Sequence, residues 1–280
     1  MLSYRHIFHA GNFADVLKHS VLIHIIDYLK KKDKPLCYID THAGPGKYPL
    51  DNEFALKNRE FDSGISQLYQ RDDLPPAIAH YVALVKELNG AGALKSYPGS
   101  PLIAQHLLRK QDHLFLCELH STEITLLTKR FKGVRGVDII HADGLKHGLG
   151  LLPPSQHRGL VMIDPSYEIK QDYRLVVDTL TAMSKRFASG TYALWYPVVE
   201  RDRINRLEKA LIATGIKNIQ LFELGIRADS SGLGMTASGM IVINPPFTLA
   251  AEMERALPYL SNVLGENNTG SYRIKTLVHE

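Results

Sequence analysis

The sequence has few cysteines and no long apolar run. Its 280 residues include two cysteines, Cys37 and Cys117, which both lie in short apolar runs. We interpret them as reduced, buried side chains rather than as a disulfide or a nucleophile. No apolar stretch approaches the ~18 residues of a membrane span, and the N-terminus does not lead into a signal-peptide core. The sequence therefore indicates a cytoplasmic protein with no membrane partner.

The chain also lacks a strong charge of either sign. Its formal net charge of +4 permits a phosphate-backbone partner but does not require one. With 45% hydrophobic and 22% charged residues, it is too apolar for a disordered chain. No internal repeat or low-complexity segment is present. The length suits one large α/β domain with an insertion, or two small domains.

Histidines, in contrast, are numerous. The chain has 13, and four of them (His6, His9, His19 and His24) lie within the first 24 residues. Such a cluster can bind a metal ion, contact nucleic acid or lie on the surface, and composition alone leaves these interpretations open.

The spacing of apolar residues predicts an α/β fold. Residues 12–32 are expected to form a helix that Asn12 caps and Pro35 ends. Apolar runs of strand length then alternate with helical stretches, which predicts a parallel, doubly wound, Rossmann-like sheet. These runs cover residues 36–40, 114–117, 137–141, 160–163, 192–196, 219–224 and 240–243. We expect the last two runs, joined by a loop that contains residues 230–234, to form an antiparallel hairpin at the end of the sheet.

One interval interrupts the alternation. Between Gly46 and Pro98 no apolar run has a clear strand signature, whereas residues 61–71 and 76–88 have helical spacing. We predict a single domain over residues 1–280 with a helical insertion at residues 48–97.

Polar features follow four of the predicted strands. Because ligands of open α/β sheets bind at the carboxyl ends of the strands, these features are candidates for a binding site. The first is Asp40 and His42 with the loop Gly44-Pro45-Gly46, where glycine lets the backbone approach a ligand closely. The loop lacks the full G-x-G-x-x-G spacing of a dinucleotide site and can also be a plain tight turn.

Acidic residues follow the next two strands. Glu118 can accept hydrogen bonds from the ribose hydroxyls of a nucleoside cofactor, or it can simply begin a helix. Asp143 can accept a hydrogen bond from the amino group of an adenine, and Gly144 permits a tight turn beside the ring. A turn without function explains this pair equally well.

The fourth feature is Asp164-Pro165-Ser166-Tyr167, which resembles the D/N-P-P-Y/F tetrapeptide of amino-group methyltransferases. An adenine N6 lone pair is delocalised into the ring, so the amino group is a weak nucleophile. The Asp164 carboxylate and the Pro165 carbonyl can each accept one amino hydrogen and so orient the lone pair toward a sulfonium methyl group. Tyr167 is predicted to stack on the base once the base has been turned out of its helix or loop. We therefore predict Asp164, Pro165 and Tyr167 as catalytic residues.

A second tetrapeptide, Asn244-Pro245-Pro246-Phe247, matches the pattern better in its letters. It follows the last predicted strand, which we expect at the edge of the sheet and away from the cofactor. The acidic residues would also precede it in the wrong order. We predict a structural role for it.

With these residues identified, the whole chain resembles the bacterial ribosomal RNA large subunit methyltransferase J family, whose members methylate adenine N6 in 23S rRNA. The resemblance is carried by residues 2–6, 9–12, 14–19, 40–44, 97–101, 190–197 and 235–240. It implies a class I methyltransferase fold, S-adenosylmethionine as cofactor, 23S rRNA as substrate and a monomer with no obligate protein partner.

The resemblance also implies roles for individual residues. The cofactor pocket is expected to include Lys18, His19, His42, Gly44, Ser100, Glu118, Asp143, Gly144 and Asp164. RNA contacts are expected from Tyr4, His6, Lys18 and Tyr167, and no metal site is implied. Ser100 is expected to cap a helix over residues 101–109 whose amino end points at the charged tail of the cofactor. Ser166 departs from the family pattern, which has a second proline there.

Three alternatives stay open at this point. A DNA adenine or cytosine amino methyltransferase shares the tetrapeptide. A metal-dependent hydrolase can be imagined on His6, His9, His42 and His141. The third alternative is a non-catalytic RNA-binding protein, which Ser166 makes conceivable.

Overall fold

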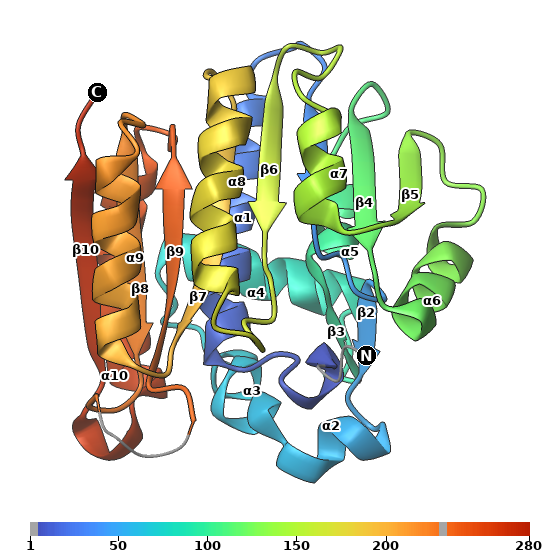
Figure 1. The fold of residues 1–280 in the computed structure, drawn as a ribbon. Coiled ribbons are helices and arrows are strands. Elements are labelled where there is room, and N and C mark those ends of the chain that lie inside the picture. The colour runs from blue at the N-terminus through green and yellow to red at the C-terminus, as the bar shows by residue number, and fades with distance from the viewer. Residues whose placement is uncertain (1–4, 230–233) are drawn as a thin grey trace.

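The structure, a computed structural model, describes residues 5–229 and 234–280. Eight strands form a central sheet in the order β10-β8-β9-β7-β6-β1-β4-β5, and β2 pairs with β3 in a separate small sheet (Figure 1). The strands are β1 (Cys37–Asp40), β2 (Lys47–Pro49), β3 (Ser96–Pro98), β4 (His113–Glu118), β5 (Val137–His141), β6 (Gly159–Ile163), β7 (Thr191–Val198), β8 (Ile219–Gly225), β9 (Ala237–Ile243) and β10 (Ser271–Val278).

Strand direction divides the sheet into two parts. Strands β7, β6, β1, β4 and β5 are parallel neighbours. Strand β9 is antiparallel to both β7 and β8, and β10 is antiparallel to β8. In Figure 1 the arrowheads of β4 and β6 accordingly point to one edge of the sheet and that of β9 to the other. We call these the carboxyl edge, where the parallel strands end, and the opposite edge.

The predicted doubly wound α/β fold is confirmed, but its last strands are placed differently. Strands β8 and β9 are antiparallel neighbours, as expected. However, β9 lies inside the sheet between β7 and β8, and the unpredicted β10 forms the end. The hairpin is therefore not at the sheet's end. Strand β10 lacks the continuous apolar run by which the other strands were predicted, because Arg273, Lys275 and Thr276 interrupt it.

Helices cover both faces of the sheet, and each face has its own apolar core. Helices α1, α4, α5, α6 and α10 pack on one face and α7, α8 and α9 on the other. Figure 1 shows α8 and α9 in front of the sheet and α1 behind it. The longer helices are α1 (Phe13–Lys30), α4 (Pro76–Leu88), α5 (Ser100–Leu107), α6 (Ser121–Phe131), α7 (Gly144–Gly150), α8 (Asp172–Arg186), α9 (Arg201–Ala213) and α10 (Leu249–Leu264). Within the described ranges, none is long and apolar enough to cross a membrane.

Helix α1 and the turn before it bring two of the N-terminal histidines, His6 and His19, to the carboxyl edge. It begins as predicted at Asn12, whose side chain accepts hydrogen bonds from the backbone N–H groups of Ala14 and Asp15. Its first half is buried against the sheet, and the short 3-10 helix η1 (His6–Phe8) precedes it. The first turn of α1 therefore has a fixed position next to the ends of the parallel strands.

The interval at residues 48–97 is mainly helical but not free of strands. Strands β2 and β3 pair at its two ends, which corrects the expectation that it holds no strand. Between them lie α2 (Glu53–Asn58), η2 (Glu60–Ser63), α3 (Ile65–Leu68) and α4. The single helix predicted at residues 61–71 is broken, because Gly64 passes too close to Gly11 and Asn12 for a side chain and Ile65 N–H donates to the Gly11 carbonyl. That these helices form an insertion in one domain stays a prediction.

Candidate active site

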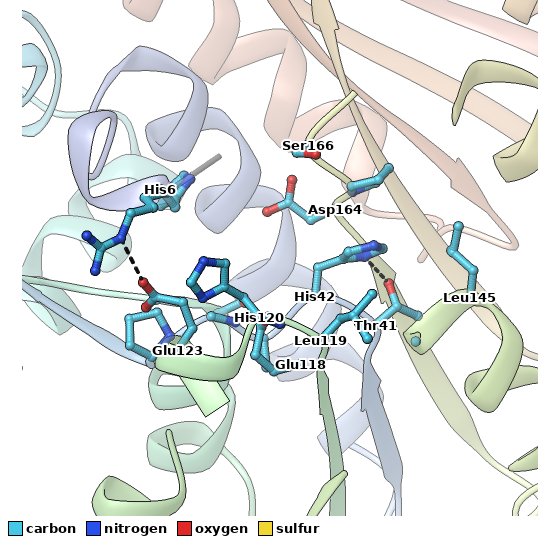
Figure 2. A pocket seen from close by; sticks show the side chains of 18 of the residues that line it. His6, Thr41, His42, Glu118, Leu119, His120, Glu123, Leu145, Asp164 and Ser166 are labelled. Atoms are coloured by element: carbon cyan, nitrogen blue, oxygen red, sulfur yellow. Dashed lines mark hydrogen bonds and ion pairs between the residues drawn. The ribbon is translucent and has the colours of Figure 1, made fainter. Parts of the chain in front are cut away.

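A cavity of about 340 Å³ opens at the carboxyl edge, where β6, β1, β4 and β5 end side by side. Its volume suits a small-molecule ligand. Figure 2 shows side chains from His42, Glu118 and Asp164 around it. The predicted residues that line it are His6, Lys18, His19, His42, Gly44, Ser100, Glu118, Asp143, Gly144, Asp164 and Pro165. The structure thus gathers residues that are up to 159 positions apart in the chain.

The glycine loop after β1 and the acid after β4 are joined. Gly44 has φ of +60°, a conformation that side chains disfavour, and a Cβ there would lie 2.5 Å from the Tyr48 hydroxyl. Its N–H donates to Glu118 Oε2 at 2.8 Å, and His120 N–H donates to Oε1 at 2.6 Å. These two hydrogen bonds fix the Glu118 carboxylate at the cavity wall, with lone pairs left for a ligand.

Asp143 and Gly144 form a tight junction between β5 and α7. Asp143 Oδ1 accepts hydrogen bonds from Leu145 N–H and Lys146 N–H and so caps the helix. Gly144 packs directly against the Thr41 carbonyl at the end of β1, where a Cβ would collide with backbone atoms. The close approach of the two strand ends therefore requires glycine at this position.

Asp40 lies behind the cavity wall and holds His42 and Ser100, which line it. It is fully buried and accepts hydrogen bonds from the Tyr38 and Ser100 hydroxyls at 2.8 and 2.7 Å and from His42 N–H at 3.2 Å. Burial raises the pKa of Asp40 to about 6, and the hydrogen bonds from Ser100 and Tyr38 oppose this rise. The Ser100 expectation was wrong in one respect: Ser100 does not cap α5, because Gly99 is the capping residue and the Ser100 hydroxyl binds Asp40. The helix also ends at Leu107 rather than at residue 109.

His19 contributes a polar atom that suits a ligand. Its ring is buried against Tyr97, with Nδ1 2.7 Å from the Tyr97 hydroxyl. Burial lowers the pKa of His19 to about 3, so the ring is neutral at physiological pH. Nε2 has no hydrogen-bond partner among the described residues although the ring lines the cavity. A bound molecule can supply that partner.

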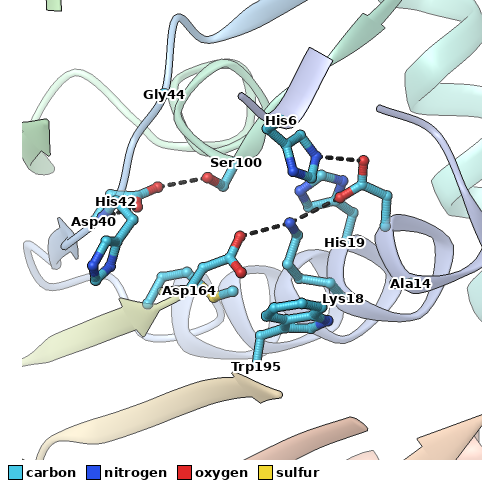
Figure 3. Close-up of polar contacts among 12 residues, drawn as sticks. His6, Ala14, Lys18, His19, Asp40, His42, Gly44, Ser100, Asp164 and Trp195 are labelled. Carbon is cyan, nitrogen blue, oxygen red and sulfur yellow. Dashed lines mark hydrogen bonds and ion pairs between the residues drawn. The ribbon is translucent and has the colours of Figure 1, made fainter. Parts of the chain in front are cut away.

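Asp164 lies at the end of β6 and is held by an ammonium group. Lys18 Nζ lies 2.6 Å from Asp164 Oδ2 and 2.8 Å from Asp15 Oδ1 (Figure 3). Burial opposes the Lys18 charge, but Asp15 and then Asp164 raise its pKa above the ordinary value. Lys18 is therefore a cation, and its ammonium faces two carboxylates rather than open solvent.

Tyr167 points away from the cavity. Its φ of +53° turns the side chain into the core between β7 and α8, where 9% of the residue is exposed. The hydroxyl donates to the Trp195 carbonyl at 2.8 Å, and the ring contacts Tyr173 at 4.5 Å between centroids. In this conformation Tyr167 cannot stack on a substrate base. Tyr4, the other aromatic residue expected to contact RNA, lies outside the described residues.

Other cavity residues carried no signal of their own in the sequence. Thr41 bridges the Met162 carbonyl and His42 Nδ1, and Arg5 is paired with Glu123 at 3.6 Å. Asp15, behind the cavity wall, also carried no signal of a role in the site: it lies one turn of helix from Lys18, and that i,i+3 spacing was the only available hint of its pairing.

The four histidines of the hydrolase alternative have separate partners. His6 contacts Asp15, His9 contacts Glu60, His42 contacts Thr41, and His141 contacts the Leu119 carbonyl. Within residues 5–229 and 234–280, no three histidine, cysteine or acidic side chains are grouped so as to hold a metal ion.

Known proteins resemble this chain over its whole length. The family model described as "Ribosomal RNA large subunit methyltransferase D, RlmJ" matches residues 33–278. Proteins named ribosomal RNA large subunit methyltransferase J from Escherichia coli (strain K12) and Haemophilus influenzae (strain Rd) are 50% and 49% identical to it, and each alignment covers 100% of both chains. A crystal structure of a Legionella pneumophila protein is 36% identical and has a TM-score of 0.88, covering 96% of this chain and 98% of that one.

The sheet order, the ligand-sized cavity at the carboxyl edge and the four strand-end features define a class I methyltransferase. More narrowly, the chain belongs to the ribosomal RNA large subunit methyltransferase J family, as the resemblance in the sequence predicted. Membership removes the hydrolase alternative, because a metal-dependent hydrolase is a different class of protein.

Proposed function

We propose that the protein transfers the methyl group of S-adenosylmethionine to the N6 amino group of one adenine in 23S rRNA. The observation that carries this proposal is the Asp164 carboxylate, which lines the cavity with one oxygen held by Lys18. The names of the relatives indicate a ribosomal RNA of the large subunit as the substrate. That the protein acts as a monomer stays a prediction.

The cavity residues fit this cofactor. Glu118 and Asp143 end adjacent strands, so the first can accept hydrogen bonds from ribose hydroxyls and the second from an adenine amino group. Gly44 and Gly144 let the backbone approach the nucleoside closely. The neutral His19 ring offers an unpaired Nε2. His42, Ser100 and Lys18 complete the proposed set of cofactor-binding residues. Ser100 acts through Asp40 and Lys18 through Asp164, because each donates a hydrogen bond to that carboxylate.

Asp164 and Pro165 are proposed to orient the target amino group. Lys18 occupies Asp164 Oδ2, which leaves Oδ1 to accept one N6 hydrogen, while the Pro165 carbonyl accepts the other. When bound, the cofactor would supply a methyl group on a sulfonium sulfur, and the sulfur–carbon bond would break, with the sulfur leaving as a neutral thioether, as the N6–carbon bond formed. N6 then loses one of its hydrogens as a proton, which the Asp164 carboxylate can accept.

RNA contacts are proposed for residues at the mouth of the cavity. His6, in η1, and Arg5 before it both line the cavity, and they directly follow Tyr4 in the sequence. Because Tyr167 is buried, we assign it a supporting role: its hydrogen bond to the Trp195 carbonyl holds the turn that presents Asp164 and Pro165.

The test is a labelling experiment with radioactive S-adenosylmethionine. The wild-type protein and Asp164→Ala are each incubated with transcribed 23S rRNA, assembled large subunits and duplex DNA, and the labelled nucleoside is identified by mass spectrometry. We expect N6-methyladenosine in RNA with the wild-type protein alone. Equal labelling by Asp164→Ala would contradict the role of Asp164, and preferential labelling of DNA would contradict the substrate.

A further inference from the structure

We propose that Asp15 is a positioning residue for methyl transfer: it shares the Lys18 ammonium with Asp164 and so sets how Asp164 is presented to the substrate. The inference rests on the proposed function for its meaning in catalysis. Its structural half, the control of Lys18 by Asp15, can be measured without any reaction.

Asp15 stands one layer behind the cavity. It is 1% exposed, does not line the cavity and contacts the site only through other residues. Oδ2 accepts hydrogen bonds from Gly11 N–H at 2.8 Å and from His6 Nε2 at 2.9 Å, and Oδ1 lies 2.8 Å from Lys18 Nζ. These contacts form a chain from His6 through the Asp15 carboxylate and Lys18 to Asp164, and Figure 3 labels His6, Lys18 and Asp164 in it.

A buried carboxylate with these partners is ionised. Burial alone would raise the pKa of Asp15, but His6 and Lys18 hold it well below the ordinary value. Asp15 therefore places a fixed negative charge beside Lys18, and His6 must present an N–H at Nε2 in order to donate to it. One carboxylate thus sets both the ring orientation of His6 and the position of the Lys18 ammonium.

This arrangement matters for the acceptor strength of Asp164. An ammonium that paired with Asp164 alone would neutralise that carboxylate and weaken it as an acceptor for the N6 hydrogens. Because Lys18 is shared, the group of two carboxylates and one ammonium keeps a net negative charge. Lys18 can then fix the rotation of the Asp164 carboxylate without cancelling its charge.

The protonation of Lys18 depends on its surroundings from several elements. Burial favours the neutral amine, and Asp15 is the largest influence that keeps the ammonium charged, ahead of Asp164. The titratable groups around this cluster are Asp15 and His19 on α1, His6 on η1, Tyr97 on β3, Asp40 on β1 and Asp164 after β6. Loss of the Asp15 charge should therefore lower the pKa of Lys18.

The experiment compares Asp15→Asn with Asp112→Asn. Asp112 is a matched control because it is also a buried aspartate paired with a cation, Arg109, but lies before β4 at the opposite edge. Single-turnover methyl transfer to 23S rRNA is measured against pH, and the Lys18 ε-carbon resonance is titrated in lysine-labelled protein, with Lys18→Met for assignment. In the wild type we expect no Lys18 titration below the ordinary lysine pKa of about 10.4.

For Asp15→Asn we expect a turnover loss of about 10-fold to 100-fold, because a mutation that misplaces a reacting group by about 1 Å can cost about 10²-fold. KM for the cofactor should change little. The Lys18 resonance should titrate at lower pH than in the wild type, and turnover should decline over that same pH range. Asp112→Asn should lower the melting temperature and leave both titrations unchanged. Unchanged titrations in Asp15→Asn, or the same shifts in Asp112→Asn, would overturn the inference.

A double variant tests whether Asp15 acts through Lys18. In Lys18→Met the ammonium is gone, so adding Asp15→Asn should cost no further activity. The double variant removes the Asp15 charge together with its cation, so only Asp164, which lines the cavity, is left without its partner. Comparing it with Lys18→Met tests the inference even if Asp15→Asn does not fold. A further tenfold loss in the double variant would show that Asp15 acts otherwise. A wild type that methylates no RNA, together with a lowered Lys18 pKa in Asp15→Asn, would overturn the proposed function and leave the coupling intact.

Discussion

Two tetrapeptides of similar sequence follow buried strands in this protein, but they lie at opposite edges of the sheet. Asp164-Pro165-Ser166-Tyr167 ends the parallel strand β6 at the carboxyl edge, beside the cavity. Asn244-Pro245-Pro246-Phe247 ends β9, which runs antiparallel, and so lies at the opposite edge. The second one matches the family pattern better in its letters. The direction of the preceding strand, and not the match to the family pattern, decides which tetrapeptide lies beside the ligand cavity.

The backbones of the two tetrapeptides also differ. In the first the left-handed residue is the last one, Tyr167, with φ of +53°; in the second it is the first one, Asn244, with φ of +51°. The Asn244 side chain donates to the carbonyls of Ala188 and Gly190, both at 2.8 Å, and closes a turn. Phe247 is 81% exposed, whereas Tyr167 is buried. The prediction that the second tetrapeptide is structural agrees with this arrangement, although β9 is not at the sheet's edge as we expected.

The sharpest test of the comparison is Asp164→Asn, which gives the catalytic tetrapeptide the first letter of its counterpart. The Asp164 carboxylate has two oxygens for two donors, Lys18 and the proposed N6 amino group, whereas an amide has one acceptor oxygen. We expect the single-turnover rate to fall by about 10²-fold to 10³-fold. Circular dichroism and the melting temperature serve as the controls for folding. A variant with near wild-type rate would show that the charge is not needed.

A second test concerns the crowding of the carboxyl edge. Gly144→Ala places a Cβ against the Thr41 backbone, whereas Gly150→Ala, at the far end of the same helix, meets no atom within 4 Å. We expect Gly144→Ala to cost about 1–3 kcal/mol in the free energy of unfolding and to weaken cofactor binding. Gly150→Ala should leave both unchanged or raise stability slightly. Thermal melting and calorimetry measure the two effects, and equal behaviour of the variants would contradict the close packing at Gly144.

Much of the site could be predicted because strand ends and glycines leave local signals. Glu118 and Asp164 directly follow an apolar run and Asp143 follows one with a single residue between, so their common edge follows from parallel strands alone. Strand direction leaves no such signal, because the apolar run of β9 would look the same in a parallel strand. Strand β10 was missed because it carries several polar residues, among them Arg273, which pairs with Glu223.

Side-chain direction after a strand was equally hidden. A tyrosine next to Asp164 can face the substrate or the core, and only the left-handed turn at Tyr167 decides between them. The position of Ser100 in the sequence likewise suits a helix N-cap, but its hydroxyl donates to the nearby buried Asp40 instead. Such choices depend on partners that are distant in the chain, so no local pattern contains them.

The opposite edge should respond to mutation in stability rather than in turnover. Asn244→Ala removes two hydrogen bonds and puts alanine in a left-handed conformation, so we expect a loss of about 1–3 kcal/mol in the free energy of unfolding. Denaturant titration measures this loss, and the rate per folded molecule should equal that of the wild type. A fall in that rate comparable to the fall in Asp164→Asn would mean that the second tetrapeptide takes part in the reaction.

The smallest expected effect is that of Ser166→Pro, which gives the catalytic tetrapeptide the middle letters of its counterpart. Within the described residues, Ser166 N–H donates no backbone hydrogen bond, so a proline removes none. Proline also restricts the residue before it to extended conformations, which leaves the Asp164 carboxylate and the Pro165 carbonyl in place as acceptors. Because both acceptors stay in place, we expect kcat within about twofold of the wild type, or higher. A twofold change in kcat corresponds to about 0.4 kcal/mol in the activation free energy. A tenfold loss, measured beside an unchanged cofactor affinity, would show that the turn into the left-handed Tyr167 needs the freedom of serine. The two tetrapeptides would then differ in backbone requirement as well as in strand direction.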